Sequence, residues 1–331
     1  MAHDHHQPAR DLALELVRAT EVAALASGRW MGRNEKESGD GAAVDAMRQA
    51  LGDVSMDGVV VIGEGEKDEA PMLFNGEHVG TGERPEVDIA VDPVEGTPLL
   101  AEGRQGATSL IAAAPRGTMF DPGPMVYMMK YVVSGEAGDV VDVDAPVKEN
   151  LRRIAKALGK GVNDVSVVML DRPRHHEMMA EVREVGARLR LITDGDSPAA
   201  LLAAMPEYPY DVVLGIGGTP EGVATACAVR ALRGNIVGRL WARNDEERAK
   251  ARELGYDVDD VLTMDRLVSS DNTFYSITGI ITGDLVEGVA YSPQGATTES
   301  VVMRGRSGTV RWIRTRHRPE KLARYKAAAQ R

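Results

Sequence analysis

Two short apolar stretches of the chain end in acidic residues that could bind metal ions. The first stretch, 59–62, is followed by Glu64 and a further acidic loop, and the second, 87–91, is followed by the hexapeptide 92–97. Both stretches are typical of buried strands bounded by turn residues. A carboxylate at the end of a buried strand is costly unless a cation neutralises it. If these side chains converge in the folded protein, they indicate a metal cluster.

The hexapeptide 92–97 offers several oxygen ligands at close spacing. Asp92 and Glu95 are three residues apart, so both carboxylates can point to one place together with the Val94 carbonyl. Such hard ligands suit Mg²⁺ or Mn²⁺. Thr97 adds a hydroxyl beside them. The alternative is an acidic turn in which Glu95 or Thr97 only caps the next helix, and the spacing alone does not decide between the two.

The other acidic candidates of the N-terminal half differ in position. Glu64 directly ends its predicted strand, which favours a metal ligand, whereas the acidic residues of 66–69 favour a solvated loop. Asp40 precedes the apolar stretch 42–47 and stands where the N-cap of a helix is expected. From its position alone, Asp40 is therefore interpreted as a helix cap.

A glycine-rich turn at 215–222 follows a predicted strand and precedes a predicted helix. Backbone N–H groups at such a turn could hold a phosphate or sugar oxygen. Pro220 stands where a dinucleotide fingerprint starting at Gly215 needs its third glycine, and no Gly-Lys-Ser/Thr of a nucleotide-triphosphate loop is present. Glu221 lies in the first turn of the helix, where a favourable interaction with the helix dipole explains it without a ligand.

Two further loops follow strands of the same region. The segment 171–176 presents two guanidinium groups suited to phosphate, and 193–196 presents two carboxylates that could accept hydrogen bonds from sugar hydroxyls. In an open parallel sheet, ligands bind at the carboxyl ends of the strands, where both loops and 215–222 are expected. This coincidence predicts a sugar-phosphate site. His175 and His176 indicate a helix start and not metal ligands.

The order of the predicted elements indicates an α/β fold. A helix is expected at 11–30 and a polar loop at 32–41. Strands are predicted at 59–62, 87–91, 108–114, 126–133, 165–170, 189–193, 212–216, 273–278, 286–291, 300–304 and 310–315. Helices are predicted at 151–158, 173–185, 199–205, 220–232 and 245–254. The alternation in the second half predicts a largely parallel sheet with crossover connections.

The domain organisation follows from the same pattern. A soft boundary near residue 160 separates a metal-binding α+β half, 10–160, from an α/β half, 161–331, that carries the sugar-phosphate loops and C-terminal strands. Residues 1–9 are expected to be a disordered tail. The turn at 304–308 predicts a hairpin between the last two strands.

Composition excludes several classes of protein. The chain has 331 residues, of which 43% are apolar and 4% aromatic, and a net charge of −11, which argues against a nucleic-acid partner. An anionic small substrate stays possible because bound cations can reverse the local field. The single cysteine, Cys227, forms no intrachain disulfide or thiolate zinc cluster and is interpreted as a buried small hydrophobe. No apolar run has the length of a membrane span and no signal-peptide core is present, so the expected location is the cytoplasm.

With these segments identified, the sequence resembles the class II fructose-1,6-bisphosphatases from about residue 10 to residue 317. Six segments in order carry this resemblance: 40–44, 61–66 with 69–72, 88–97, 172–175, 194–196 and 215–222. Each segment alone is weak evidence for the family, whereas all six segments in this order are highly specific for it. The hexapeptide is also similar to the Asp-Pro-Ile/Leu-Asp-Gly-Thr motif of the lithium-sensitive, metal-dependent sugar and inositol phosphatases. That superfamily implies a layered α-β-α-β-α sandwich.

The resemblance implies hydrolysis of the C1 phosphate of fructose 1,6-bisphosphate, the gluconeogenic reaction, with two or more Mg²⁺ or Mn²⁺ ions. The implied ligands of one ion are Asp40 and Glu64, and those of a second are Asp92, Glu95 and Glu221. The implied catalytic residues are Thr97, Glu64 and Lys36. The implied substrate contacts are Glu95, Gly96, Thr97, Tyr127, Arg172, Pro173, Arg174, Asp194, Gly195, Asp196 and Gly218. For Asp40 and Glu221 the resemblance replaces the capping and dipole interpretations.

The sequence departs from the family pattern in a few places. Asn34 and Glu35 precede Lys36 where Gly-Asp is expected, Gly106 replaces an asparagine, and Pro98 replaces a small polar residue or arginine. None of these changes removes an implied ligand, but they affect the loop geometry near 98–106.

Rival functions share much of this pattern. One is a dual enzyme that also hydrolyses sedoheptulose 1,7-bisphosphate, and another is an inositol monophosphatase, whose substrate has no second phosphate to anchor. A third is a non-catalytic sugar-phosphate sensor, which the complete set of implied ligands disfavours. We expect a sugar bisphosphate as the small-molecule partner, no nucleic-acid or membrane partner, and a homo-oligomer, either a dimer or a tetramer.

Overall fold

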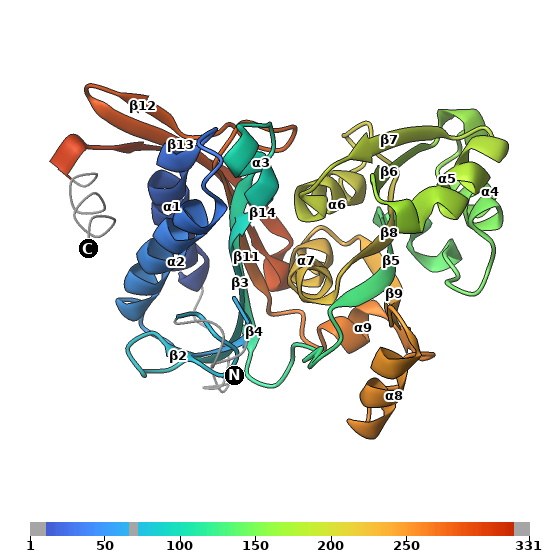
Figure 1. Ribbon diagram of the computed structural model, residues 1–331, viewed down its shortest axis with the longest axis horizontal. Helices are drawn as coiled ribbons and strands as arrows, with labels where there is room; N and C mark the ends of the chain where they lie inside the picture. Colours follow the sequence, from blue (N-terminus) through green and yellow to red (C-terminus); the bar gives the residue numbers. More distant parts are fainter. Residues whose placement is uncertain (1–10, 66–71, 321–331) are drawn as a thin grey trace. The chain divides into compact units, whose positions relative to one another are not determined.

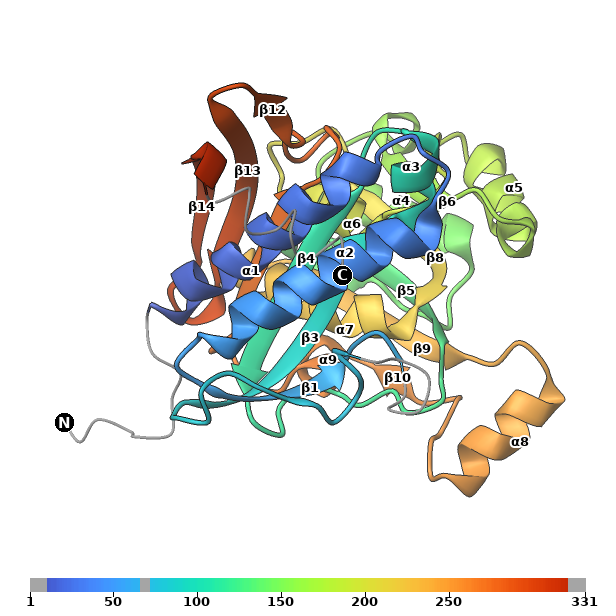
Figure 2. The same ribbon diagram turned by 60° about the vertical axis from the view of Figure 1, so that its left-hand side comes forward.

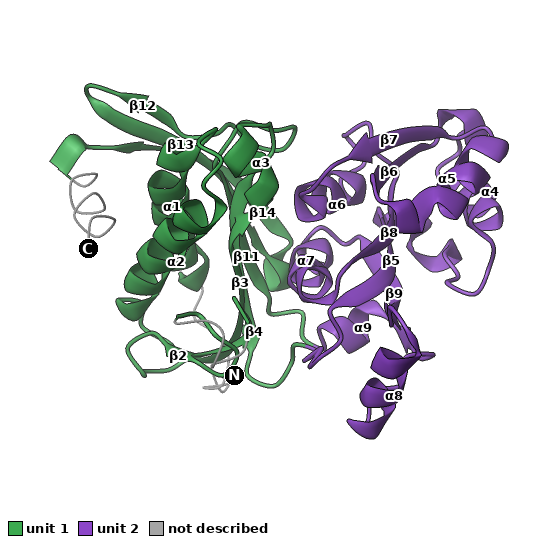
Figure 3. Ribbon diagram, viewed as in Figure 1, with its two compact units in different colours: residues 1–119, 270–331 green, residues 120–269 purple. Residues whose placement is uncertain are grey.

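The computed structural model describes residues 11–65 and 72–320 of the chain. These residues form two compact units, which Figure 3 colours separately. Unit 1 combines 1–119 with 270–331, and unit 2 comprises 120–269. The boundary predicted near residue 160 falls inside unit 2. The tail predicted at 1–9 and the acidic residues of 66–69 lie outside the described residues.

Unit 1 is built on a mixed sheet. Its described strands are β1 (Asp57–Ile62), β2 (His78–Val79), β3 (Glu86–Glu95), β4 (Thr108–Pro115), β11 (Phe274–Gly279), β12 (Ala290–Ser292), β13 (Gly295–Arg304) and β14 (Thr309–His317). The order is β12-β13-β11-β4-β3-β1-β2, with β14 also paired to β13. Strands β1 and β3 are parallel, whereas β3, β4 and β11 pair antiparallel. Almost every residue of β3, β4 and β11 is buried, as expected where both faces of a strand are covered.

Helices α1 (Leu12–Ser27) and α2 (Lys36–Gly52) lie side by side across this sheet, as Figure 2 shows, and a 3₁₀ turn, η1 (Gly28–Trp30), follows α1. Leu16 and Met47 from the two helices share a buried apolar core with Ile89 of β3. The short helix α3 (Thr97–Glu102) begins directly after β3. This packing fixes the end of β3 beside the first half of α2.

The start of α2 corrects the sequence prediction. The polar loop predicted at 32–41 is wrong in its second half, because the helix begins at Lys36 and Glu35 is the N-cap, so Asp40 lies inside the helix and does not cap it. Gly39 lowers the helical propensity here, yet it is buried, and a Cβ at this position would lie 2.9 Å from Leu100 Cδ2. Tertiary packing against α3 therefore overrides the local preference for a loop.

Unit 2 contains a second mixed sheet with the order β10-β9-β5-β8-β6-β7. Its described strands are β5 (Tyr127–Val133), β6 (Ser166–Leu170), β7 (Arg188–Ile192), β8 (Val212–Gly218), β9 (Asn235–Trp241) and β10 (Val261–Leu262). Strands β7, β6 and β8 are parallel, as predicted, but β5 runs antiparallel to both β8 and β9 over its full length. The prediction of a largely parallel sheet is therefore only partly correct, because a strand from outside the alternating region is inserted into it.

Helices cover both faces of this second sheet (Figure 1). On one face lie α4 (Val147–Ala157) and α5 (His176–Glu184), which share an apolar core with β6 and β8. On the other lie α6 (Asp196–Ala204) and α7 (Thr219–Ala231), which contains the buried Cys227. The remaining described elements of unit 2 are α8 (Asp245–Glu253), α9 (Met264–Leu267), η2 (Gly135–Val140), η3 (Val162–Asp164) and η4 (Pro173–His175). Two mixed sheets with flanking helices confirm the α/β class and are consistent with the predicted sandwich.

The hairpin and the short strands agree with the sequence predictions to different degrees. The predicted hairpin is confirmed, since β13 and β14 pair through η5 (Gly305–Ser307), and Gly308 takes a positive φ of 58°. The strand predicted at 286–291 is reduced to β12, whereas β2, β9 and β10 had no predicted counterpart. Among the described residues, no helix has the length and apolar character to cross a membrane.

Candidate active site

The hexapeptide 92–97 forms the end of β3 and the start of α3. The pairing of β3 with β4 is irregular between Asp92 and Glu95, and Asp92 Oδ1 accepts a hydrogen bond from the Val94 N–H at 3.0 Å. Gly96 then turns the chain with a φ of 87°. A Cβ at Gly96 would lie 2.9 Å from Leu99 Cδ1, so both the backbone conformation and the packing require glycine. The irregular strand end places two carboxylates, one of them on the buried Glu95, next to a helix start.

Thr97 connects this strand end to α2. Its Oγ1 donates a hydrogen bond to Asp40 Oδ1 at 3.0 Å, and the Val94 carbonyl oxygen lies 3.2 Å from the same hydroxyl. Asp40 and Thr97 are 57 residues apart in the chain. The fold therefore brings Asp40 to the hexapeptide.

Burial disfavours the charged forms of two carboxylates in this unit. It raises the pKa of Asp40 to about 6, although the hydrogen bond from Thr97 and the charge of Lys36 both act to lower it. Burial also raises the pKa of Glu64 to about 7, and the nearby Asp40 raises it further. Glu64 nevertheless keeps part of its surface open to solvent. Both carboxylates would ionise more readily if a cation were bound beside them.

The five predicted metal ligands are divided between the two units. Asp40, Glu64, Asp92 and Glu95 belong to unit 1, and Glu221 belongs to unit 2. Within 11–65 and 72–320, no three carboxylate, histidine or cysteine side chains are grouped closely enough to hold an ion. The assignment of these ligands therefore stays a prediction. Lys36, the first residue of α2, is exposed and acts on Asp40 through its charge.

The donor chemistry nevertheless fits a hard divalent ion. All five predicted ligands are carboxylates, the ligand type that Mg²⁺ and Mn²⁺ prefer. Glu221 lies in the first turn of α7, and its Oε2 is buried without a hydrogen-bond partner within the described part of the chain. Burial raises the pKa of Glu221, and Asp196 raises it further, whereas Lys130 lowers it. A buried carboxylate oxygen in this state is a suitable ligand for a cation.

In unit 2, the three predicted sugar-phosphate loops lie at one edge of the sheet. The segments 171–176 and 193–196 follow the carboxyl ends of β6 and β7, as the sequence predicted, whereas the predicted turn 215–222 is the carboxyl end of β8 and the first turn of α7. Arg174 donates two hydrogen bonds to the Ile216 carbonyl oxygen, at 3.1 Å from Nε and 2.8 Å from Nη2. Arg172 Nη2 lies 3.7 Å from Asp194 Oδ2. Side chains of 171–176 therefore connect the other two loops.

An aromatic ring lies at the centre of the basic residues of this edge. The Arg174 guanidinium lies over the Tyr127 ring at 5.0 Å from its centroid, and the Arg243 guanidinium lies at 5.9 Å. Trp241 contacts the same ring edge-on at 6.1 Å. Burial lowers the pKa of Arg174, although a guanidinium stays charged at neutral pH. The sequence did not indicate Arg243, because it follows β9, a strand that was not predicted.

His175 holds one of these loops to the sheet. Its Nδ1 lies 2.7 Å from the Leu170 carbonyl oxygen, and its Nε2 lies 2.7 Å from the Ile216 backbone nitrogen. Burial lowers the pKa of His175, so the neutral ring donates from Nδ1 and accepts at Nε2. η4 ends at His175 and α5 begins at His176, which agrees with the helix start predicted from this pair.

Comparison with known proteins identifies the family. The profile described as "Bacterial fructose-1,6-bisphosphatase, glpX-encoded" matches residues 10–317. The chain belongs to this family. It is 44% identical over 321 residues to "Fructose-1,6-bisphosphatase 1 class 2" of Escherichia coli (strain K12), which covers 93% of this chain and 95% of that protein. "Fructose-1,6-bisphosphatase class 2" of Shigella flexneri gives the same identity and coverage.

This membership confirms the resemblance to the class II fructose-1,6-bisphosphatases, and the matched residues agree with the predicted extent. Two side chains of the sugar-phosphate edge, Arg243 and Lys130, were not among the residues that the sequence indicated. Lys130 is a buried charge within β5, and an isolated lysine in an apolar strand carries no local signal of its partner. Both side chains became recognisable only when the sheet placed β5 between β8 and β9.

Proposed function

We propose that the protein hydrolyses the C1 phosphate of fructose 1,6-bisphosphate, giving fructose 6-phosphate and phosphate. The observation that carries this proposal is the match to class II fructose-1,6-bisphosphatases, which extends over 95% of the length of the relatives. Hydrolysis of this phosphate is the gluconeogenic reaction. We further propose that the protein acts in the cytoplasm as a homo-oligomer, either a dimer or a tetramer.

The proposed reaction depends on two or more Mg²⁺ or Mn²⁺ ions. Asp40 and Glu64 would hold one ion, and Asp92, Glu95 and Glu221 would hold another. Such ions would supply positive charge that offsets the negative charge of the phosphate, so that a nucleophile can approach it, and would activate water. The carboxylates of the chain supply the ligands, and their raised pKa values favour metal binding at neutral pH over acidic pH.

Residues around the reacting phosphate would orient the attacking water. We assign Thr97 to this role, because its hydroxyl already lies between Asp40 Oδ1 and the Val94 carbonyl oxygen. Lys36 would lie near the reacting phosphate and contribute positive charge. The contribution of the protein is then mainly positioning and electrostatic stabilisation.

The loops of unit 2 would bind the part of the substrate that does not react. Arg172 and Arg174 would anchor the distal phosphate, since one guanidinium group can donate two parallel hydrogen bonds to phosphate oxygens. Asp194 and Asp196 would accept hydrogen bonds from sugar hydroxyls. The remaining proposed contacts of this site are Glu95, Gly96, Thr97, Tyr127, Pro173, Gly195 and Gly218.

A phosphate-release assay tests the proposed function. Purified protein should release phosphate from fructose 1,6-bisphosphate with Mg²⁺ or Mn²⁺, and EDTA should abolish the release until excess metal is added back. Sedoheptulose 1,7-bisphosphate and inositol 1-phosphate, assayed in parallel, define the substrate class. Activity that is unaffected by EDTA, or no release from any bisphosphate, would overturn the proposal.

A further inference from the structure

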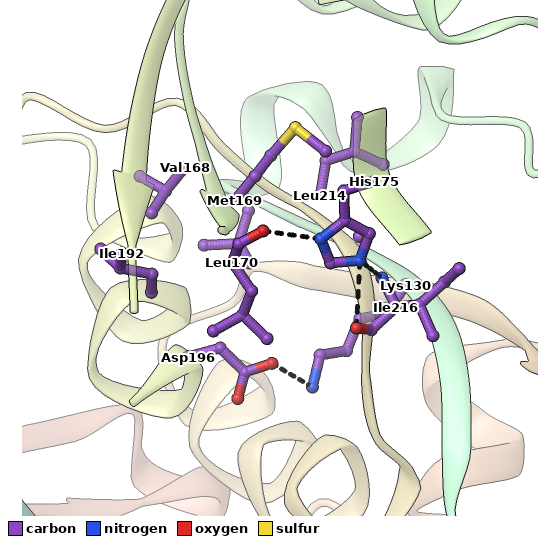
Figure 4. A pocket seen from close by; sticks show the side chains of 11 residues that line it. Lys130, Val168, Met169, Leu170, His175, Ile192, Asp196, Leu214 and Ile216 are labelled. Carbon is purple, nitrogen blue, oxygen red and sulfur yellow. Dashed lines mark hydrogen bonds and ion pairs between the residues drawn. The ribbon is translucent and has the colours of Figure 1, made fainter. Parts of the chain in front are cut away.

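A buried lysine lies beneath the sugar-phosphate loops of unit 2. Lys130 belongs to β5 and is 2% exposed. Its Nζ lies 2.8 Å from Asp196 Oδ2 and donates to the Gly218 carbonyl oxygen at 3.4 Å. Figure 4 shows the two side chains facing each other in a small pocket that His175 and Ile216 also line. A buried ammonium is stable only where a carboxylate and hydrogen-bond acceptors compensate its lost hydration.

The glycine-rich end of β8 and the start of α7 lie directly against this ion pair. A Cβ at Gly217 would lie 2.4 Å from Asp196 Oδ2 and 3.1 Å from Lys130 Nζ. A Cβ at Gly222 would lie 3.8 Å from Lys130 Cδ and 2.5 Å from Met128 Sδ. The backbone therefore approaches the pair at a distance that only glycine allows at position 217. This packing connects the carboxyl end of β8 to Asp196, the first residue of α6.

We propose that Lys130 is a positioning residue for the sugar-phosphate substrate. Its ammonium holds the Asp196 carboxylate and the Gly218 carbonyl in fixed orientations, so that two of the proposed substrate contacts are set before the substrate arrives. Lys130 engages Oδ2 of Asp196, and we assign Oδ1 to a sugar hydroxyl. This inference rests on the proposed function, since it takes Asp196 and Gly218 as substrate contacts.

The alternative is an ion pair that only stabilises the fold. Both roles predict a loss of stability when Lys130 is replaced, because Asp196 would be left as a buried charge without its partner. Only the positioning role predicts weaker binding of the sugar phosphate in protein that is still folded. The two roles are therefore separated by the Michaelis constant and by product binding, and not by melting temperature.

The test replaces Lys130 by methionine, which keeps most of the stem and removes the charge. With saturating metal, Lys130→Met should raise KM for fructose 1,6-bisphosphate by about tenfold or more, with a much smaller change in kcat. The Kd of fructose 6-phosphate, measured by calorimetry, should rise in parallel. An unchanged KM and Kd in the folded variant would overturn the inference.

A second lysine–aspartate pair at the other end of the same sheet provides a control, although its lysine is exposed and not buried. Lys160 pairs with the buried Asp211, whose Oδ2 accepts a hydrogen bond from the Ser166 N–H at the start of β6. Lys160→Met should lower the melting temperature without changing KM or Kd. If Lys160→Met raises KM as much as Lys130→Met does, general destabilisation explains the effect and the positioning role is wrong.

A double variant tests whether Lys130 acts through Asp196. It also covers the case in which the single variant Lys130→Met fails to fold. Lys130→Met with Asp196→Asn removes both charges of the ion pair, so neither partner of the pair is left as an unpaired buried charge. Its KM should be no higher than that of the weaker-binding single variant, because the two residues act as one unit. Additive increases in KM would show independent roles and contradict the inference.

The two proposals fail in different ways. Wild-type protein that binds fructose 6-phosphate but releases no phosphate would contradict the proposed hydrolysis, and the effect of Lys130→Met on Kd would still decide the role of Lys130. Wild-type protein with normal phosphatase activity, combined with an unaffected Lys130→Met variant, would contradict only the role of Lys130. Wild-type protein that neither binds nor hydrolyses these sugar phosphates would overturn both proposals.

Discussion

Single carboxylates carry the proposed chemistry, and their surroundings are consistent with that role. Asp40 accepts a hydrogen bond from Thr97, and its pKa is raised mainly by burial. Glu64 has a raised pKa from burial and from Asp40. Carboxylates with raised pKa values cluster at functional sites. A bound divalent cation is the simplest compensation for both.

Replacing a proposed ligand should abolish turnover. Glu64→Ala and Asp92→Ala should each lower kcat/KM by at least about a hundredfold, because even residues that only support metal ligands cost about 10–100-fold when removed. The measurement is phosphate release with saturating Mn²⁺. Near-normal activity in either variant would refute its assignment.

An exposed acidic residue of the same unit serves as the control. Glu37 lies in the first turn of α2, on the helix that carries Asp40, and is exposed. Glu37→Ala removes the same charge from the protein without touching a proposed ligand. We expect its activity to stay within about twofold of wild type, as is usual for surface substitutions.

At the scale of elements, the parallel strands β6, β7 and β8 place three loops at one edge. The sequence predicted this placement from the alternation of strands and helices, because the carboxyl ends of neighbouring parallel strands meet at one edge. It did not predict β9, although β9 brings Arg243 to Tyr127. Gly234 and Gly238 interrupt the apolar pattern of that stretch, so a strand was not recognised there.

Removing Arg174 should mainly weaken substrate binding. Arg174→Ala should raise KM for fructose 1,6-bisphosphate by about tenfold or more and change kcat little, because the distal phosphate does not react. Arg174→Lys should restore only part of the affinity, since lysine cannot make the paired contacts of a guanidinium. Steady-state kinetics of the three proteins checks this, and a loss confined to kcat would show that the anchoring role is wrong.

Gly218 should be intolerant of a side chain for a steric reason alone. Its φ of −62° and ψ of 138° suit any residue, but a Cβ would lie 1.6 Å from Glu221 Oε2. Gly218→Ala should therefore displace Glu221 and weaken metal activation, seen as a higher Mn²⁺ concentration for half-maximal activity. Activity at the wild-type Mn²⁺ requirement would contradict the proposed ligand role of Glu221.

A glycine with open space around it provides the comparison. Gly41 lies in α2, and a Cβ there would meet no atom within 4 Å. Gly41→Ala should raise the free energy of unfolding by about 0.5–1 kcal/mol, because alanine favours the helix. Its Mn²⁺ requirement should match that of wild type, although it neighbours Asp40.

At the scale of the whole molecule, the raised pKa values link stability to pH and to metal. A carboxyl with a folded-state pKa above its unfolded value contributes stability at low pH, and this contribution is lost as pH rises through the folded pKa. For Asp40 and Glu64 that loss falls between about pH 4 and pH 7 in metal-free protein. Metal binding should reverse the loss by compensating the charges.

The melting temperature measures this linkage. Mn²⁺ should raise the melting temperature of the protein more at pH 8 than at pH 5.5, because protons compete with the ion at the lower pH. The variant Glu64→Gln, which cannot titrate at this position, should show a smaller difference between the two pH values. Equal stabilisation by Mn²⁺ at both pH values would contradict the proposed role of these carboxylates.

Local sequence determined the family, the candidate ligands and most of the strands, because apolar periodicity and ordered short motifs are properties of neighbouring residues. The start of α2 at Lys36, the insertion of β5 beside β8, and the pairing of Lys130 with Asp196 were decided only by the tertiary structure. In each case the stabilising contact joins residues far apart in the chain. Local helix and strand propensities do not predict such a contact, because the contact stabilises the protein only when the sheet and its helices are packed together.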